Sequence, residues 1–392
     1  MQEILHKKSD QNKKNKLEPY RNLSMNIPLV DLKANYDSIK KEIDETIQHV
    51  LNDTAFINGL YLHDFETNFA SFCNVKHAIG ASSGTTALHL ALLAADIQPG
   101  DEIITVPNTF IATTETISQA QGKIGFVDVK KDTALIDIDQ LEKQITRKTK
   151  ALIIVHLYGQ MPDMKQIKEI AIDHDLFLIE DAAQAHAAEY LGHQPGYYGD
   201  IATFSFFPAK NLGCYGDGGG IVTNNDKIAE NIRLLLNHGR KEKYTHYVEG
   251  YNYRLDALQA AILNTKLSYL HTWTDQRRTH ASYYDKHLPE PIQTPVEAAN
   301  AKHVYYMYEI QAPQRDKLQA YLKKHGIQTG IHYPIPLHLQ PAYEYLNLKK
   351  GSFPISEYLS EHILSIPMYP ELTTDQQDYI IDQINTFYKK QN

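Results

Sequence analysis

Cysteine is almost absent from this chain of 392 residues, which contains only Cys73 and Cys214. Two thiols so far apart in the sequence do not make a disulfide framework or a zinc site. This usage is typical of a protein that works in a reducing compartment, and we expect it in the cytoplasm.

An excess of positive charge and long apolar segments are also missing. The 39 Lys and Arg residues face 47 Asp and Glu residues, a formal net charge of −8, so nucleic acid is not an expected partner. No apolar run approaches the roughly 18 residues that a membrane span needs, and we expect no signal peptide and no membrane partner. The rest of the composition is ordinary for a globular protein, with enough chain for about two domains.

The order of the sequence patterns predicts an α/β fold. Residues 1–24 are lysine-rich and polar, and we expect them to form a disordered extension. Apolar residues recur at helical spacing from Tyr36 to Leu51. Strand-like runs then alternate with helical stretches, which predicts a mostly parallel sheet covered on both faces. The last two strand-like runs, IATFSF and GGIVTN, are joined by a loop, so part of the sheet is expected to be antiparallel.

The pattern changes near Asn252. The segment DALQAAILNTKLSYLHTWTDQRRTHASYYDKHL predicts one long helix that leads into a second domain. We therefore expect a large domain at residues 25–255, followed by a bridging helix and a smaller C-terminal α/β domain at residues 256–392.

Ligands of open α/β sheets bind at the carboxyl ends of the strands, so we expect the site residues there. In ASSGTTALHLAL a strand ends, turns and starts a helix, and Ser83, Gly84 and Thr85 could seat a phosphate with backbone N–H groups and hydroxyls. An ordinary helix cap explains these residues too. Phe110 follows the next strand, where its ring could stack on a flat ligand or belong to the core.

Two acids and a lysine give a sharper signal. The strand LFLIED ends in Glu180 and Asp181, and a carboxylate there needs a cationic partner or good hydrogen-bond donors. Lys210 follows the strand that contains Ser205, just before a glycine-rich loop. A lysine at the edge of a dry pocket has a lowered amine pKa, which makes it nucleophilic. A phosphate seat, a stacking ring, an acid for a ring nitrogen and a reactive lysine together describe a site for pyridoxal 5′-phosphate.

Eight segments of residues 26–392 give the sequence a resemblance to the pyridoxal-phosphate-dependent nucleotide-sugar aminotransferases of the DegT/StrS type. They are IPLVDLKANY, SSGTTALHLAL, PNTFIATTE, FVDV, HLYGQMPDM, IEDAAQAHAA, FSFFPAKNLGCYGDGG and GYNYRLDALQAAIL. The resemblance implies the aspartate-aminotransferase fold, known as fold type I.

The resemblance also implies roles for individual residues. Lys210 would carry the cofactor as an imine, with pyridoxamine phosphate as the form that holds the transferred nitrogen. Asp181 would bind the pyridine nitrogen, and Gln184 would contact the hydroxyl side of the ring. Phosphate contacts would come from Gly84, Thr85 and Ser205, and Phe110 would stack on the ring. Asn252 would reach the phosphate in a neighbouring subunit, which implies a homodimer with shared active sites.

Substrate expectations rest on the loop GIHYPIPLHLQPAY, which resembles that of members aminating C3 of a dTDP-linked 3-keto-6-deoxyhexose. Tyr333 and His338 would face the sugar or nucleotide, with L-glutamate as the amino donor. Arg254, Arg240, Lys241 and Lys243 could bind the diphosphate or simply form a solvated face. Amination at C4 of a UDP- or dTDP-4-keto sugar, or a non-catalytic regulatory role, remain the alternatives.

Overall fold

The computed structural model describes residues 25–390 and is built around a mixed sheet with the strand order β1-β8-β7-β5-β4-β2-β3. These strands are β1 (His77–Ala81), β2 (Glu102–Thr105), β3 (Lys123–Phe126), β4 (Thr149–Val155), β5 (Phe177–Asp181), β7 (Ile201–Ser205) and β8 (Gly219–Thr223). The adjoining strands from β3 to β7 are parallel, whereas β8 is antiparallel to both β7 and β1. This confirms the mostly parallel sheet with an antiparallel part.

Alternation along the strands creates two cores, one on each face of this sheet. One core joins Ile153, Ile179 and Ile201 to residues of α5 (Gly84–Ala94) and α9 (Asp226–Leu235). The other joins Leu152, Leu178 and Ala202 to residues of α4 (Leu60–Cys73) and α8 (Met164–Asp173). Burial on both faces explains why the strands read as nearly continuous apolar runs.

Two helices stand where one long helix was predicted. α10 (Ala257–Leu267) and α11 (Leu270–His287) are separated at Ser268 and Tyr269, where the Ser268 hydroxyl donates to the Thr265 carbonyl oxygen at 2.8 Å. A serine hydroxyl that bonds the preceding turn competes with the regular helix ladder. The predicted helix from Tyr36 to Leu51 is likewise divided, into α2 (Leu32–Ser38) and α3 (Lys40–Asp53).

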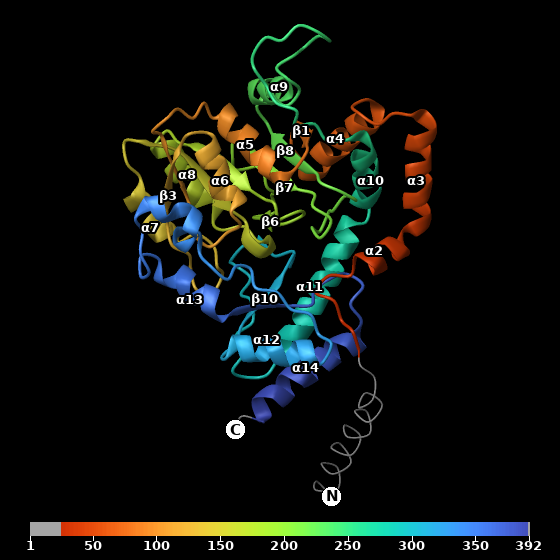
Figure 1. Ribbon diagram of the computed structural model, residues 1–392, viewed down its shortest axis with the longest axis vertical. Coiled ribbons are helices and arrows are strands. Elements are labelled where there is room, and N and C mark those ends of the chain that lie inside the picture. Colours follow the sequence, from red (N-terminus) through yellow and green to blue (C-terminus); the bar gives the residue numbers. More distant parts are fainter. Residues whose placement is uncertain (1–24, 391–392) are drawn as a thin grey trace, which may run out of the picture.

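A smaller region lies below the sheet in Figure 1, and α11 runs down into it. It contains the antiparallel pair β10 (Tyr308–Gln311) and β11 (Ile363–Ile366), with α12 (Arg315–Lys324) and α14 (Thr374–Lys389). Its separate core includes Ile27, whose backbone bonds Gly326 and Gln328. The start of the described chain therefore packs on the smaller region.

The remaining elements complete the description of residues 25–390. They are α6 (Ala112–Gln119), α7 (Ile138–Gln144), α13 (Pro354–His362), the pair β6 (Glu189–Tyr190) and β9 (Ala301–Lys302), and the 3-10 turns η2 (Leu157–Gly159), η3 (Leu337–Leu339) and η4 (Pro341–Leu346). No helix in this part of the chain is both long and apolar enough to span a membrane. The extension predicted at residues 1–24 lies outside the described residues.

Candidate active site

The predicted phosphate seat lies at the N-terminus of α5. Ser83 is the N-cap, and its hydroxyl accepts a hydrogen bond from the Thr86 backbone N–H at 3.1 Å, while the Thr86 hydroxyl accepts one from the Ser83 N–H at 3.0 Å. This capping box fixes the start of the helix, where Gly84 and Thr85 present backbone N–H groups that have no intrahelical partner. Such a terminus favours an anion.

Ser205 reaches this helix start from a distant part of the sequence. A Cβ atom at position 84 would lie only 2.7 Å from the Cβ of Ser205, and one at Gly219 would lie 2.1 Å from the Ser83 carbonyl oxygen. Glycine is therefore required at both positions by the close approach of β7 and β8 to the turn. The structure brings together Ser83, Gly84 and Ser205, as a shared phosphate site requires.

Asp181 ends β5 in a buried position. Its carboxylate accepts hydrogen bonds from the Thr113 hydroxyl at 2.8 Å and from the Ala183 backbone N–H at 3.2 Å. Burial raises the pKa of Asp181, while those two donors and the positive charge of Lys210 act in the opposite direction. Asp181 is thus an anchored acid that a cationic ring nitrogen would help to keep ionised.

Glu180, the neighbouring acid, points to the opposite face of the sheet. Its carboxylate accepts from the His156 ring at 2.8 Å and from the backbone N–H groups of Gly196 and Gly199. Glu180 is therefore satisfied by structural partners, which leaves Asp181 as the acid of the site.

Lys210 lies in the loop after β7, and its Nζ is 4.3 Å from the centre of the Tyr306 ring. Burial lowers the pKa of its amine to about 8, and the charge of Asp181 partly opposes that effect. Near neutral pH a useful fraction of this amine is unprotonated, as a nucleophile and proton carrier requires.

Gln184 is held from two sides beside this lysine. Its Oε1 accepts from the Tyr158 backbone N–H at 2.7 Å, and its Nε2 donates to the Tyr333 hydroxyl at 3.2 Å. The Tyr333 ring centre lies 5.8 Å from that of Phe110, whose side chain is half exposed. Tyr158, Thr113 and Tyr306 were not predicted from the sequence, although Tyr158 stands in the segment HLYGQMPDM and Thr113 in PNTFIATTE.

His338 does not face open space. Only 2% of the residue is exposed, and its Nε2 lies 3.0 Å from the Glu357 carboxylate. The neighbouring Leu337 N–H donates to the Pro107 carbonyl oxygen at 2.9 Å. The expected contact of His338 with the sugar or nucleotide is therefore not seen, because its ring is buried against Glu357 in a loop that Leu337 fixes to Pro107.

The predicted diphosphate-binding bases and Asn252, the predicted phosphate contact of a neighbouring subunit, lie in a second group. Arg254 forms a bridge with Ala81 at the end of β1, and its Nη1 donates to Asn237 at 2.8 Å. Its buried Nε has no partner in the described part of the chain. Asn252 is exposed and pairs with Asn237 across the base of a hairpin at residues 238–251.

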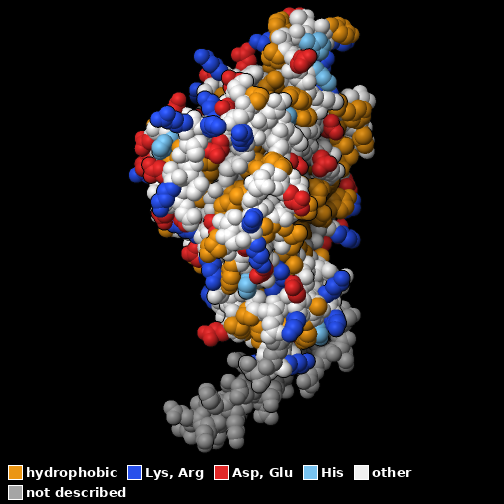
Figure 2. Space-filling view, turned by 60° about the vertical axis from the view of Figure 1, so that its left-hand side comes forward, with side chains coloured by type: hydrophobic (Ala, Val, Ile, Leu, Met, Phe, Trp, Pro, Cys, Tyr) orange, Lys and Arg blue, Asp and Glu red, His pale blue; other side chains and the backbone are white. Residues whose placement is uncertain are grey.

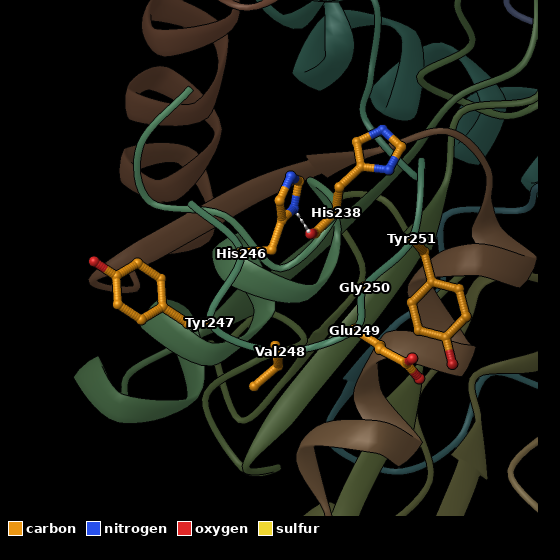
Figure 3. A pocket seen from close by; sticks show the side chains of 7 residues that line it. All are labelled: His238, His246, Tyr247, Val248, Glu249, Gly250 and Tyr251. Carbon is orange, nitrogen blue, oxygen red and sulfur yellow. Dashed lines mark hydrogen bonds between the residues drawn. The ribbon is translucent and has the colours of Figure 1, made fainter. Parts of the chain in front are cut away.

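This hairpin projects above α9 in Figure 1, and Figure 2 shows apolar and histidine side chains gathered at that tip. Tyr244 is 82% exposed. In Figure 3 the His246 ring turns toward the His238 carbonyl oxygen, to which it is bonded at 2.7 Å. Lys241 pairs with Glu230 at 2.6 Å, and Arg240 bonds the Lys243 carbonyl oxygen. Arg240 and Lys241 therefore have partners within the hairpin and on α9.

The donor set fits pyridoxal phosphate. A helix start with a serine suits its phosphate, an anchored carboxylate suits its ring nitrogen, and an amine with lowered pKa suits its aldehyde. Among residues 25–390, no group of three or more His, Cys, Asp and Glu side chains is arranged to hold a metal ion.

Comparison with known sequences decides the family. Residues 37–385 match the DegT/DnrJ/EryC1/StrS aminotransferase family. The chain belongs to this family. It is an aminotransferase, its cofactor is pyridoxal phosphate, and its fold is that of the family, as the sequence analysis predicted.

Relatives extend over nearly the whole chain. A protein of Geobacillus stearothermophilus named pleiotropic regulatory protein is 48% identical over 369 residues, which are 93% of this chain and 99% of the relative. A Streptomyces venezuelae protein named dTDP-3-amino-3,4,6-trideoxy-alpha-D-glucose transaminase is 39% identical, covering 93% and 97%. The crystal structure of S. venezuelae DesV in complex with a ketimine intermediate superposes with a TM-score of 0.90 at 40% identity, covering 92% and 98%.

Proposed function

We propose that this aminotransferase moves an amino group from L-glutamate to a dTDP-linked 3-keto-6-deoxyhexose, giving a 3-amino-3,6-dideoxyhexose. The observation that carries the transamination is that Lys210, whose amine pKa is lowered, lies within electrostatic range of the anchored Asp181. The similarity to a Streptomyces transaminase of a dTDP-3-amino sugar supports the substrate class. We also place the enzyme in the cytoplasm, where the buried free thiols Cys73 and Cys214 would stay reduced.

The residues of the chain divide the work as follows. Pyridoxal phosphate, when bound, supplies an electron sink that weakens bonds at the α-carbon of an attached amine. Ser83, Gly84, Thr85 and Ser205 would hold its phosphate, Asp181 would keep its ring nitrogen protonated, and Gln184 and Phe110 would orient its ring. The Lys210 amine would take up a proton from the α-carbon of the donor and deliver it to the C4′ atom of the cofactor.

Substrate binding would need a second copy of the chain. The hairpin at residues 238–251 projects from its own chain, and we propose that it and the exposed Asn252 complete the site of a partner in a homodimer. Arg254, Arg240, Lys241 and Lys243 would then offer positive charge to the diphosphate. Tyr333, already bonded to Gln184, is the residue that we expect nearest the keto carbon.

Two other functions need to be separated from this one. Amination at C4 uses the same cofactor chemistry on a UDP- or dTDP-4-keto sugar and differs only in how the sugar is oriented. A regulatory role is favoured by the name of the Geobacillus relative. Retention of Lys210 and Asp181 together supports an enzyme, because transamination needs both the amine and the acid that faces the ring nitrogen.

The test is an assay of the purified enzyme with glutamate and, in parallel, dTDP-linked 3-keto and 4-keto hexoses and their UDP counterparts. We expect glutamate alone to bleach the visible absorbance of the bound cofactor, and the dTDP-3-keto sugar to restore it with formation of a 3-amino sugar detectable by NMR. Restoration by the 4-keto isomer would establish the C4 function instead. Failure of every keto sugar, with the cofactor bound, would favour the regulatory role.

A further inference from the structure

A buried polar network joins the smaller region to the cofactor site. Glu309 on β10 and Ser365 on β11 are paired across the two strands, and both are almost fully buried. The Ser365 hydroxyl donates to Glu309 Oε1, and His332 Nδ1 lies 2.6 Å from the same hydroxyl oxygen. Because that hydroxyl already donates to the carboxylate, it must accept from His332, which fixes the proton of the imidazole on Nδ1.

His332 passes this constraint to the cofactor site through its backbone. Its carbonyl oxygen accepts from the Tyr158 hydroxyl, and the next residue is Tyr333. Tyr158 and Tyr333 are the two residues that hold the Gln184 side chain. Three hydrogen bonds and the peptide bond between His332 and Tyr333 therefore close a ring that runs from Gln184 through Tyr158, His332 and Tyr333 back to Gln184.

The same network lies next to the reactive lysine. The Tyr306 N–H donates to the Tyr158 carbonyl oxygen at 2.9 Å, and the Tyr306 ring faces Lys210. The segment before His332 is anchored as well, because Gly330 exchanges two backbone hydrogen bonds with Ser365 at 3.1 and 2.9 Å. A shift of Ser365 would thus reach the loop through the backbone and the side chain together.

We propose that Glu309 and Ser365 are positioning residues of the active site: through His332 they set the orientation of Tyr333 and Gln184 toward the cofactor. Neither the Glu309 carboxylate nor the Ser365 hydroxyl bonds Gln184 or Lys210, so both act through His332, whose Nδ1 also lies 3.4 Å from Glu309 Oε1. A buried acid is costly without partners, and among residues 25–390 the basic side chain within ion-pair distance of Glu309 is His332, not a Lys or Arg. This inference rests on the proposed cofactor role of Gln184.

The experiment compares Glu309→Gln and Ser365→Ala with Ser360→Ala in the pyridoxal-phosphate-loaded full chain. Ser360 on α13 is the control, because it too is a buried serine, and its hydroxyl donates to the Glu357 carbonyl oxygen outside the network. Visible circular dichroism of the bound cofactor and the rate of bleaching by glutamate are measured, with thermal unfolding alongside. Neither optical readout depends on the identity of the sugar.

We expect the two network variants to retain cofactor but to change its circular dichroism and to slow bleaching between about tenfold and a hundredfold, as misplaced active-site groups do. The double variant Glu309→Gln/Ser365→Ala should be no slower than the slower single variant, because both act through one chain of bonds. In a Tyr333→Phe background, Glu309→Gln should add little. Ser360→Ala should lower only the unfolding temperature.

The inference is overturned if Glu309→Gln and Ser365→Ala match Ser360→Ala in both optical readouts, or if their effects on bleaching multiply. If the network variants do not fold, Ser365→Thr replaces them in the experiment. This variant keeps the hydroxyl and should give the parent spectrum. Persistence of the altered spectrum in a folded Ser365→Thr protein would also count against the inference. If the parent protein itself fails to bind cofactor or to bleach, the proposed function fails instead.

Discussion

Two lysines of this molecule share one physical property and differ in what surrounds them. Burial lowers the pKa of both the Lys210 and the Lys266 amines to about 8. Lys266 lies on α10, is only 3% exposed, and donates from Nζ to the Gly213 carbonyl oxygen at 2.6 Å. Lys210 instead faces the Tyr306 ring and the charge of Asp181.

The neighbours of each amine therefore decide its role. The Lys266 amine donates its hydrogen bond to the backbone of the loop that follows Lys210. The ring centres of Tyr215 and Trp273 lie 4.9 and 6.0 Å from its Nζ. It is a clamp enclosed by protein. Lys210 has a carboxylate within electrostatic reach and the phosphate seat near the end of the same strand. A lowered pKa marks a lysine as desolvated, and only the surrounding donor set marks it as reactive.

Removal of each amine gives the largest contrast. Lys210→Ala should reduce transamination by a factor on the order of 10⁴ or more, because the group that carries the proton is lost. Lys266→Met should stay within about tenfold of the parent, since it keeps the length of the side chain and alters only the support of the loop. Both rates are measured with glutamate and the best keto sugar found. Equal losses in the two variants would contradict the division of roles.

The two consecutive acids at the end of β5 give the next contrast. Asp181→Asn should slow bleaching by glutamate roughly 10²-fold to 10³-fold, because a preorganised charge at the reacting centre is removed. Glu180→Gln should affect the same rate less and lower the unfolding temperature more, since its carboxylate holds His156, Gly196 and Gly199. A larger kinetic effect at Glu180 would show that the wrong acid has been assigned.

Lys266 should also leave a signature in the pH dependence of stability. Its folded pKa of about 8 lies below the ordinary 10.5, so between these values the unfolded chain binds more protons and stability rises with pH. From pH 8 to 9.5 the parent should gain roughly 2 kcal/mol relative to Lys266→Met, at 1.36 kcal/mol per pH unit. Urea unfolding at several pH values measures this gain. A constant difference between the two proteins would mean that Lys266 is not desolvated in the folded state.

Much of the cofactor site could be predicted because its parts sit at strand ends. Parallel strands bring their carboxyl ends to one edge, so Asp181, Ser205 and the Ser83 turn had to meet once the alternating pattern was read. The apolar runs of β4 and β5 likewise predicted a sheet that is covered on both faces. Such nearly continuous apolar runs are expected in any fold that buries both faces of its sheet.

The parts that could not be predicted depend on long-range contacts. Nothing local to His338 reveals that Glu357 would enclose it, and the clamp at Lys266 is visible only once α10 packs beside the loop of Gly213. The division between α10 and α11 was missed because neither glycine nor proline marks it. Tyr158 could not be predicted for a similar reason, since its hydrogen bonds to Gln184 and His332 span 26 and 174 residues.

The smallest contrast uses two helix starts that have the same cap. Ser83 with Thr86 begins α5, and Thr373 with Gln376 begins α14 through an equivalent capping box far from the site. Ser83→Ala and Thr373→Ala should each lower the free energy of unfolding of the apoprotein by about 1 kcal/mol, because each leaves one N–H without its side-chain acceptor. Only Ser83→Ala should weaken the binding of pyridoxal phosphate, measured by titration of the apoprotein. Equal weakening of cofactor binding in both variants would mean that cofactor affinity follows overall stability. It would contradict the assignment of the α5 N-terminus as the phosphate site.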